Sequence, residues 1–272
     1  MIRKVTDAKQ VNFLFDGWEE TMIWSCLQGV MGDLYADYSG DAADSYQISG
    51  PEAAKAILGD FVFLAGKPSE ELLSYQPPCR AGKKVESQIL VPRDADWENL
   101  IEKVYGSRAE RITRYAIKKE PDVWDGQGRE RLKKMASALP EGYELRLIDQ
   151  ELYDQCRQQE WSRDLVSQFP DYETYQKWGL GTAALHGKHL VCGASSYSRY
   201  LEGIEIEIDT REDYRRKGLA RACAARLILE CLDRGLYPSW DAHTEISAEL
   251  AEKLGYHRGE EYTAYLLMGS RK

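Results

Sequence analysis

Three carboxylates alternate with isoleucines just before a basic turn in the second half of the chain. The segment from Ile204 to Asp209 reads Ile-Glu-Ile-Glu-Ile-Asp, the period-two pattern of a strand with isoleucines on one face and acids on the other. A carboxylate there could remove a proton from a bound amine or hold its ammonium form, so Glu205 and Glu207 are candidate bases. Glu202, at the start of the strand, is a third. The alternative is that these acids form only the solvated face of an amphipathic strand.

A cluster of cations and a glycine follows this strand directly. A helix with an apolar stripe of period 3.6 begins behind the glycine. Glycine at the mouth of a helix lets backbone N–H groups approach a phosphate closely, and the helix dipole attracts the anion. The residues that would form this pyrophosphate site are Arg215, Arg216, Lys217, Gly218, Leu219 and Ala220. The alternative is a basic helix start with no ligand.

The elements that must position these residues follow a mixed α and β rhythm. In the second half, strands are predicted at 143–148, 181–185, 189–197, 203–210, 239–242 and 262–268, with helices at 153–168, from about 218 and at 246–254. In the first half, strands are predicted at 31–37, 60–65 and 111–119, with helices at 53–58, 70–74 and 129–139. The helix at 53–58 is inferred from Pro51 near its first turn and from Gly59 after it. This rhythm predicts an N-terminal α/β domain at 1–125, a connecting segment at 126–142 and a second α+β domain at 143–272.

Composition and charge narrow the class of protein. The chain has 272 residues with 36 Lys plus Arg against 45 Asp plus Glu, a net charge of −9. This balance argues against general binding to nucleic acid or to an anionic membrane, and it is compatible with an amine substrate or with solubility alone. We find no signal peptide and no membrane-spanning run, and no metal-ligand spacing among the four histidines. We therefore expect a cytoplasmic protein without a metal. The six cysteines are predicted to be reduced thiols, with two of them in a helical core: Cys26, Cys79, Cys156, Cys192, Cys223 and Cys231.

The basic turn resembles the pyrophosphate-binding signature of the GNAT N-acetyltransferase superfamily. That signature is Arg or Gln, two residues, Gly, one residue, then Gly or Ala, and residues 215–220 match it. A strand precedes the match, a long helix follows it, and the later segment 247–256 resembles the superfamily's helix that ends in Lys, an apolar residue, Gly and an aromatic residue. The resemblance covers residues 143–272. It implies a GNAT fold, with a mixed, mostly antiparallel sheet flanked by helices.

A closer resemblance extends over most of the chain. Segments 25–37, 59–68 and 240–256 look like those of bacterial two-part GNAT proteins with a distinct N-terminal domain. Some such relatives are thought to acetylate amine-bearing antibiotics. The N-terminal domain could supply an acceptor wall, a dimer surface or only stability, so a homodimer stays open.

The resemblance also implies site residues and shows two departures. The backbone at Ile206 and Ile208 would hold the pantetheine arm or the thioester oxygen of acetyl-CoA. Ser247 would contact the same arm, or would serve only the start of its helix. Thr244 stands where many relatives have Asn. Ala251 stands where they often have the tyrosine that protonates the leaving thiolate.

Nearby tyrosines could replace the missing acid. Tyr256, Tyr262 and Tyr265 are close in sequence, although packing in the core or at the surface is the default role for any single one of them. We predict an N-acetyltransferase that moves an acetyl group from acetyl-CoA to the primary amine of a small molecule, by direct attack in a ternary complex. The rival hypothesis is a CoA-binding regulatory or scaffold module without turnover, which the absent tyrosine favours.

Overall fold

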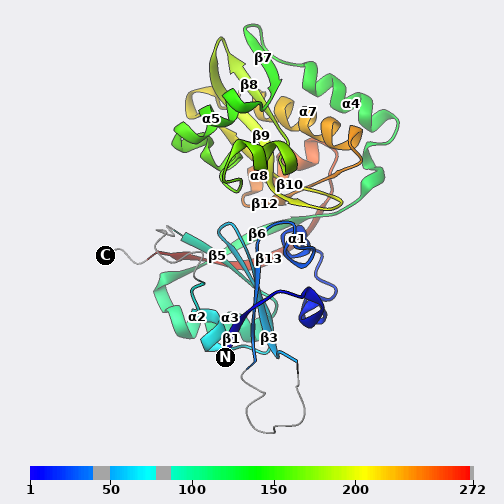
Figure 1. Ribbon diagram of the computed structural model, residues 1–272. Helices are drawn as coiled ribbons and strands as arrows, with labels where there is room; N and C mark the ends of the chain where they lie inside the picture. The colour runs from blue at the N-terminus through cyan, green and yellow to red at the C-terminus, as the bar shows by residue number, and fades with distance from the viewer. Residues whose placement is uncertain (39–49, 78–86, 270–272) are drawn as a thin grey trace. The chain divides into compact units, whose positions relative to one another are not determined.

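The chain folds into two compact units. The computed structural model describes residues 1–38, 50–77 and 87–269, so Cys79 lies outside the described residues. One unit comprises Met1–Arg114 together with Tyr262–Lys272, and the other comprises Tyr115–Glu261 (Figure 1). The chain therefore passes from one unit to the other inside two strands, β6 (Ala109–Ile117) and β13 (Arg258–Met268).

This division differs from the predicted one at both ends of the second domain. The helix predicted at 129–139 is present as α4 (Gln127–Ser137), but it belongs to the C-terminal unit and not to a connecting segment at 126–142. Leu132 of that helix is buried in the core of the C-terminal unit, with Met135 packed against it. The last strand, expected in the second domain, contributes Tyr262 onward to the N-terminal unit. Local sequence could not reveal either assignment, because both depend on which distant strand each segment joins.

The N-terminal unit is built on a sheet with strand order β1-β2-β3-β4-β5-β13-β6. Strands β1 to β4 pair antiparallel in sequence order, β4 and β5 run parallel, and β5 pairs antiparallel with β13. The first five strands are β1 (Ile2–Val5), β2 (Asp33–Asp37), β3 (Ala53–Leu58), β4 (Phe61–Gly66) and β5 (Ser87–Pro92). The helical segments are η1 (Ala8–Gln10), η2 (Asn12–Phe15), α1 (Thr21–Leu27), α2 (Glu70–Ser74), α3 (Ala95–Tyr105) and η5 (Gly106–Arg108).

Residues 53–58 form a strand, so the helix predicted there was wrong. All six residues are buried, and they pair with β2 on one side and β4 on the other. This short run, in which Lys55 is the one charged residue and is itself buried, carries no alternation that would distinguish a strand from a helix. Gly59, expected to end a helix, has φ 57° and forms a two-residue turn with Asp60 between β3 and β4. Positive φ suits such a hairpin turn as well as a helix end.

The C-terminal unit carries a five-stranded sheet in the order β11-β10-β9-β8-β7. Strands β7 to β10 pair antiparallel, and β10 runs parallel to β11, so the predicted mixed, mostly antiparallel sheet with flanking helices is confirmed. The five strands are β7 (Tyr143–Leu147), β8 (Gly181–His186), β9 (His189–Tyr200), β10 (Gly203–Thr210) and β11 (Tyr237–Ser239). The short β12 (Asp241–Ala242) pairs instead with β6, at the end of the other sheet. The helical segments besides α4 are η6 (Pro121–Trp124), α5 (Gln150–Gln158), η7 (Glu160–Leu165), α6 (Tyr172–Trp178), η8 (Glu212–Tyr214), α7 (Leu219–Asp233) and α8 (Glu245–Lys253).

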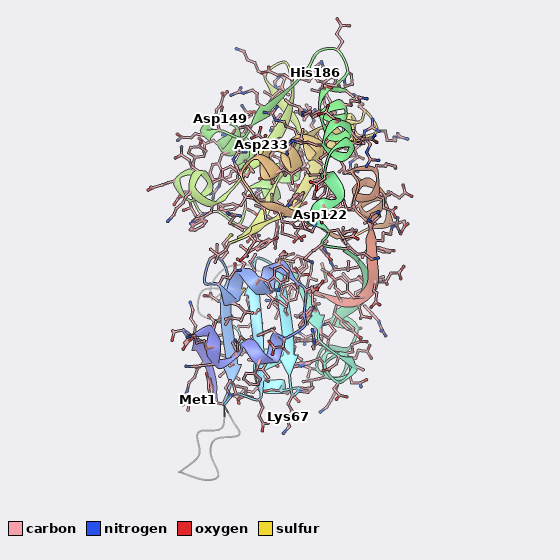
Figure 2. The ribbon with its side chains drawn as sticks, turned by 90° about the vertical axis from the view of Figure 1, so that its right-hand side faces the viewer. Met1, Lys67, Asp122, Asp149, His186 and Asp233 are labelled. Carbon is pink, nitrogen blue, oxygen red and sulfur yellow. The ribbon has the colours of Figure 1, made fainter. Side chains whose placement is uncertain are left out.

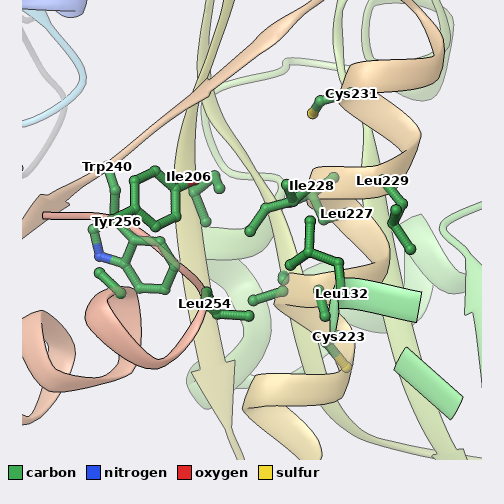
Figure 3. Packing of buried hydrophobic residues seen from close by; sticks show 14 of the residues in the cluster. Leu132, Ile206, Cys223, Leu227, Ile228, Leu229, Cys231, Trp240, Leu254 and Tyr256 are labelled. Carbon is green, nitrogen blue, oxygen red and sulfur yellow. The ribbon is translucent and has the colours of Figure 1, made fainter. Parts of the chain in front are cut away.

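Different helices cover the two faces of this sheet. Helix α7 contributes Cys223, Leu227 and Ile228 to the same buried cluster as Ile204 and Ile206 of β10. Figure 3 shows part of this cluster, including Ile206, Leu227 and Ile228. The predicted core role of Cys223, and of Cys231, is confirmed, since both are fully buried. Segment η7 covers the other face, because a side chain added at Gly193 of β9 would meet Leu165 at 2.5 Å, whereas the neighbouring residues of Gly193 belong to the α7 core.

Polar residues stand at the ends of two elements of this unit, the start of α5 and the end of β8. Asp149 precedes α5 and accepts a hydrogen bond from the Leu152 N–H at 3.0 Å, as a helix cap does. Figure 2 labels Asp149 and also His186, the last residue of β8. The His186 ring stacks on Tyr143 with centroids 4.8 Å apart.

Within the described residues, no helix is long and apolar enough to cross a membrane.

Candidate functional site

Strand β10 has an open backbone edge beside the basic turn. It pairs with β9 from Gly203 to Thr210, but its parallel pairing with β11 covers only Gly203 to Glu205. After Ser239 the chain turns into β12, which pairs with the last residues of β6 instead. Among the described residues, 206–210 therefore have no strand neighbour on that side. We call residues 206–210 the open edge.

The backbone of the open edge can bind an extended ligand. The Ile208 N–H does not point to β9, since it donates to a carboxylate oxygen of Glu207 at 3.1 Å. N–H groups alternate along a strand, so the Ile206 N–H faces the same way. Both residues proposed to hold the pantetheine arm or the thioester oxygen thus present N–H groups at this edge. The Ile208 N–H is already satisfied by the Glu207 carboxylate, so a chain of amide groups such as pantetheine would replace that carboxylate as its partner.

The turn between β10 and α7 has the backbone geometry of an anion site. Gly218 has φ 80° and precedes α7 without a side-chain cap. Arg216 has φ 62°, and it is the one non-glycine residue with positive φ within 1–38, 50–77 and 87–269. Left-handed residues in such a turn direct successive N–H groups into a concave nest that suits phosphate. Because a non-glycine residue in this conformation is strained, the strain itself points to a functional turn.

The predicted cations of the turn lie at the surface. Arg215, Arg216, Lys217 and Gly218 are exposed, whereas Leu219 is buried in the core and anchors the start of the helix. Ala220 is half-buried against the same core. A side chain added at Gly218 would meet only an Arg221 nitrogen at 3.9 Å. The protein itself therefore leaves room at this glycine, which is what binding of an anion to the turn requires.

Glu205 and Glu207, the two candidate bases of the strand, differ in burial and in contacts. Glu205 is 4% exposed, so the solvated-face interpretation is wrong for this residue. It lies opposite Ser198 of β9 and Ser239 of β11, at the point where β10 and β11 separate. Glu207 is half-buried and its carboxylate caps the Ile208 N–H. Of the two candidate bases, Glu205 is the one held inside the sheet.

The third candidate, Glu202, lies in the exposed turn between β9 and β10. Its carbonyl oxygen accepts a hydrogen bond from the Tyr237 N–H at 2.8 Å. That bond extends the β10–β11 pairing by one residue. The backbone of Glu202 therefore helps to align the two parallel strands, while its side chain extends from a turn.

Asp209, at the end of the same strand, is an acid that sequence reasoning did not single out as a site residue. Burial, and after it the negative charge of Asp164, raises the pKa of its carboxyl group to about 7, although the positive charge of Arg215 opposes both. Asp164 belongs to η7, far away in the sequence. No local pattern could have revealed this pair of acids.

The raised pKa of Asp209 gives a pH-dependent stability. Its folded pKa, about 7, lies above the ordinary aspartate value of about 3.9. From about pH 4 to 7 the folded state thus holds a proton that the unfolded state has lost, and stability falls as pH rises. Asp209→Asn should remove this fall and raise the free energy of unfolding at pH 8 by ~1–4 kcal/mol, while leaving it unchanged near pH 3.5. Urea unfolding at both pH values measures this, and equal stabilities at pH 8 would contradict it.

The segment from Thr244 to Ala251 contains the predicted Ser247 and the two positions at which the sequence departs from its relatives. Thr244 caps α8 by accepting the Ser247 N–H at 3.2 Å. The Ser247 hydroxyl accepts the Trp240 indole N–H at 3.1 Å. Ala251 is fully buried in the α7 core, so the larger side chain that many relatives have there would need space that this core does not offer.

Tyr256 is a core residue in this structure. Its ring packs against Trp240, with centroids 5.6 Å apart (Figure 3), and its hydroxyl donates to the Pro238 carbonyl at 2.5 Å. Burial raises the pKa of this hydroxyl well above its usual value. These contacts favour packing over proton transfer to a thiolate. The other two tyrosines considered, Tyr262 and Tyr265, belong to the N-terminal unit.

The described residues contain no group of three or more His, Cys, Asp or Glu side chains that could hold a metal ion.

Tyr214 gathers several charged and polar partners beside the turn. The ammonium of Lys217 lies 4.4 Å from its ring centroid, and its hydroxyl lies 3.2 Å from His186 Nδ1. These contacts hold η8 next to the hairpin of β8 and β9.

Comparison with known proteins agrees with this geometry. A sequence model of the family described as GNAT acetyltransferase matches residues 12–265. The chain is 28% identical over 268 residues to the uncharacterized N-acetyltransferase YdfB of Bacillus subtilis strain 168, covering 92% of this chain and 91% of that protein. A crystal structure of a GCN5-related N-acetyltransferase-like protein from Streptococcus suis 89/1591 shares 48% identity, with a TM-score of 0.83 over 95% of this chain and 97% of that one.

A more distant solved structure shares the fold alone. It is described as a tandem GNAT protein from the clavulanic acid biosynthesis pathway, and it matches with 8% identity and a TM-score of 0.52 over 100% of this chain and 99% of that one. The family match extends across both units and includes the open edge, the strained turn and the helix behind it. The chain belongs to the GNAT acetyltransferase family and is an acyltransferase.

Proposed function

We propose that the enzyme transfers an acetyl group from acetyl-CoA to the primary amine of a small molecule. The observation that carries the proposal is the juxtaposition of the open edge of β10 with the strained, cationic turn at Arg216 and Gly218. The turn would bind the pyrophosphate through backbone N–H groups and the α7 dipole. The open edge would bind the pantetheine arm, which directs the thioester toward the point where β10 and β11 separate.

The residues at that point suit attack by an amine. Glu205 lies there, buried between Ser198 and Ser239. An acceptor that arrives as an ammonium ion must lose a proton before its nitrogen can attack the thioester carbon, and Glu205 would take that proton. As the carbon–nitrogen bond forms and the carbon–sulfur bond breaks, a backbone N–H of the open edge would meet the negative charge on the thioester oxygen.

The leaving thiolate still needs a proton. Ala251 cannot supply it, and the Tyr256 hydroxyl donates to Pro238. As the amide forms, the attacking nitrogen releases its second proton to solvent, and the leaving thiolate takes one proton from solvent, so the protons balance. Solvent can protonate this thiolate near neutral pH because the pKa of a thiol is about 8.5. Direct transfer in a ternary complex needs no covalent enzyme intermediate.

The rival function is a CoA-binding module without turnover. The buried alanine at position 251 is the observation that favours it. Release of free thiol from acetyl-CoA, measured against a panel of aliphatic, aromatic and aminoglycoside-type amines, separates the two. We expect thiol release above the hydrolysis background with at least one class of amine. Tight binding of acetyl-CoA with no release from any of them would support the module instead.

A further inference from the structure

The two units repeat one arrangement of strands. In the N-terminal unit, four antiparallel strands, β1 to β4, are followed by a helix and by β5, which runs parallel to β4. In the C-terminal unit, β7 to β10 are followed by a helix and by β11, parallel to β10. Helical segments also separate the first two strands of both units. We infer that the N-terminal unit is a second copy of the transferase fold whose cofactor site is closed by its own chain.

The parallel strands of the N-terminal copy stay together. Strand β4 pairs with β5 from Phe61 to Leu64, and the Arg93 N–H donates to the Leu64 carbonyl at 3.0 Å to continue the pairing. In the C-terminal unit the equivalent pairing stops at Glu205 and leaves residues 206–210 open. The N-terminal copy therefore lacks the free backbone edge that would hold a pantetheine arm.

The turn after β4 is also closed. Gly66 has φ 78°, but a side chain there would meet the Glu52 carbonyl at 2.2 Å. The Trp97 indole donates to the Gly66 carbonyl at 2.8 Å, and the Ser69 hydroxyl caps the helix that follows. That helix, α2, has five residues, whereas α7 has fifteen. Protein groups thus pack closely around Gly66, the last residue of β4, whereas the turn before α7 leaves room around Gly218.

The copy is completed by the far end of the chain. Strand β13 lies between β5 and β6, with Tyr265 opposite Leu90 and Leu266 opposite Ile89. Tyr265 is buried and its hydroxyl donates to Glu102 of α3 at 2.6 Å. The N-terminal unit therefore depends on a strand that follows the whole C-terminal unit in sequence.

The number of CoA molecules bound per chain tests whether the cofactor site of the N-terminal unit is closed. The choice of CoA as the ligand rests on the proposed function. Isothermal titration of the full chain with CoA should give one site per chain, and Gly218→Asp should leave none. Two sites, or one site kept in Gly218→Asp, would overturn the inference. Absence of any binding to the wild-type chain would instead overturn the proposed function.

Hydrogen exchange tests the copy without any ligand. Leu266→Pro in the full chain removes one N–H group from β13 and adds a ring that a central strand does not accommodate. Exchange in β4 and β5 should become at least ~10-fold faster, while β9 and β10 should keep their wild-type protection. Equal acceleration in all four strands, or in none, would refute a copy that is completed by β13.

A separate observation concerns the residue opposite Glu205. Ser198 is fully buried, and within the described part of the chain its hydroxyl has no hydrogen-bond partner. Directly opposite residues of an antiparallel pair share one face, with Cβ atoms ~5 Å apart. Strand β9 carries an extra residue, Tyr197, next to this pair, because the register shifts between Glu205 and Ile206. A buried hydroxyl without a partner is costly, and a bulge beside it indicates a functional position.

We propose that Ser198 is a positioning residue, which holds one water molecule between its hydroxyl and the Glu205 carboxylate. This proposal rests on the proposed function. The water would accept the proton of the acceptor ammonium and pass a proton to Glu205, so that charge and proton number balance. Through this water the proton would reach Glu205, which is 4% exposed, without direct contact between the amine and the carboxylate.

Ser198→Ala distinguishes this role from packing. Turnover should fall ~10-fold, and the acidic limb of the pH–rate profile should move to higher pH because the carboxylate loses a hydrogen-bonded partner. The melting temperature should stay equal or rise. Ser195→Ala is the matched control, since Ser195 is equally buried but its hydroxyl bonds Tyr175 at 2.9 Å; it should melt lower with an unchanged pH profile. A wild-type rate and pH profile in Ser198→Ala would overturn the proposal, whereas an inactive wild-type enzyme would overturn the proposed function.

Discussion

Gly218→Asp should weaken acetyl-CoA binding by at least ~10²-fold. A carboxylate ~4 Å from a phosphate costs ~4 kcal/mol at an effective dielectric constant near 20, which exceeds a hundredfold change in affinity. The substitution should not break the fold, because the nearest atom to an added side chain is an Arg221 nitrogen at 3.9 Å. Titration calorimetry, or the rise in melting temperature with added acetyl-CoA, measures the loss.

Two matched variants separate charge from backbone strain. Gly218→Asn keeps the size of the new side chain and tolerates positive φ better than most residues, so it should bind more tightly than Gly218→Asp. Gly235 follows α7 at its other end, with φ 67° and no atom within 4 Å of an added Cβ. Gly235→Asp therefore places the same strain and charge away from the turn, and it should bind acetyl-CoA like the wild type. Undiminished affinity in Gly218→Asp would contradict a pyrophosphate site at this turn.

Glu205→Gln should lower kcat by ~10²-fold or more, the usual scale for loss of a general base. Glutamine keeps the shape of the side chain between Ser198 and Ser239, so acetyl-CoA affinity should stay near that of the wild type. The acidic limb of the pH–rate profile should vanish in the same variant, because the group that must be deprotonated for activity is gone. Steady-state rates between pH 6 and 9, together with calorimetric affinity, test both parts.

The neighbouring acids serve as controls for Glu205. Glu207 caps the Ile208 N–H from a half-buried position, and Glu202 extends from an exposed turn. Glu207→Gln and Glu202→Gln should each change kcat by less than ~10-fold. If all three variants turned over at wild-type rates across this pH range, catalysis would rest on positioning an amine that is already neutral.

Much of the site could be predicted from sequence because its parts are adjacent in the chain. Strand β10 has the predicted bounds Gly203–Thr210, and α7 begins at Leu219, directly after the glycine that was expected to precede it. The turn needs only local chemistry, namely a glycine that adopts positive φ, cations around it and an apolar helical stripe behind it. The family resemblance, carried by these residues, is confirmed by the match over residues 12–265.

Other elements could not be predicted because their neighbours are distant. Residues 53–58 are apolar enough for either a helix or a buried strand, and only pairing with β2 and β4 decides between them. The isoleucine and glutamate alternation suggested equal roles for Glu205 and Glu207. The parallel strand β11 covers the first of them and not the second, so burial differs between residues with the same local pattern.

By itself, the sequence determined the order of elements around the turn, the glycine with positive φ and the cations. Each of these features depends only on residues that are close to one another in the chain. Tertiary structure decided which acid is buried, which serine faces it and where the units divide. Each of these depends on register between strands that are far apart in sequence, above all the bulge at Tyr197 and the return of β13. Strand register is set by the sum of many side-chain contacts over a sheet face, and no single stretch of residues contains that sum.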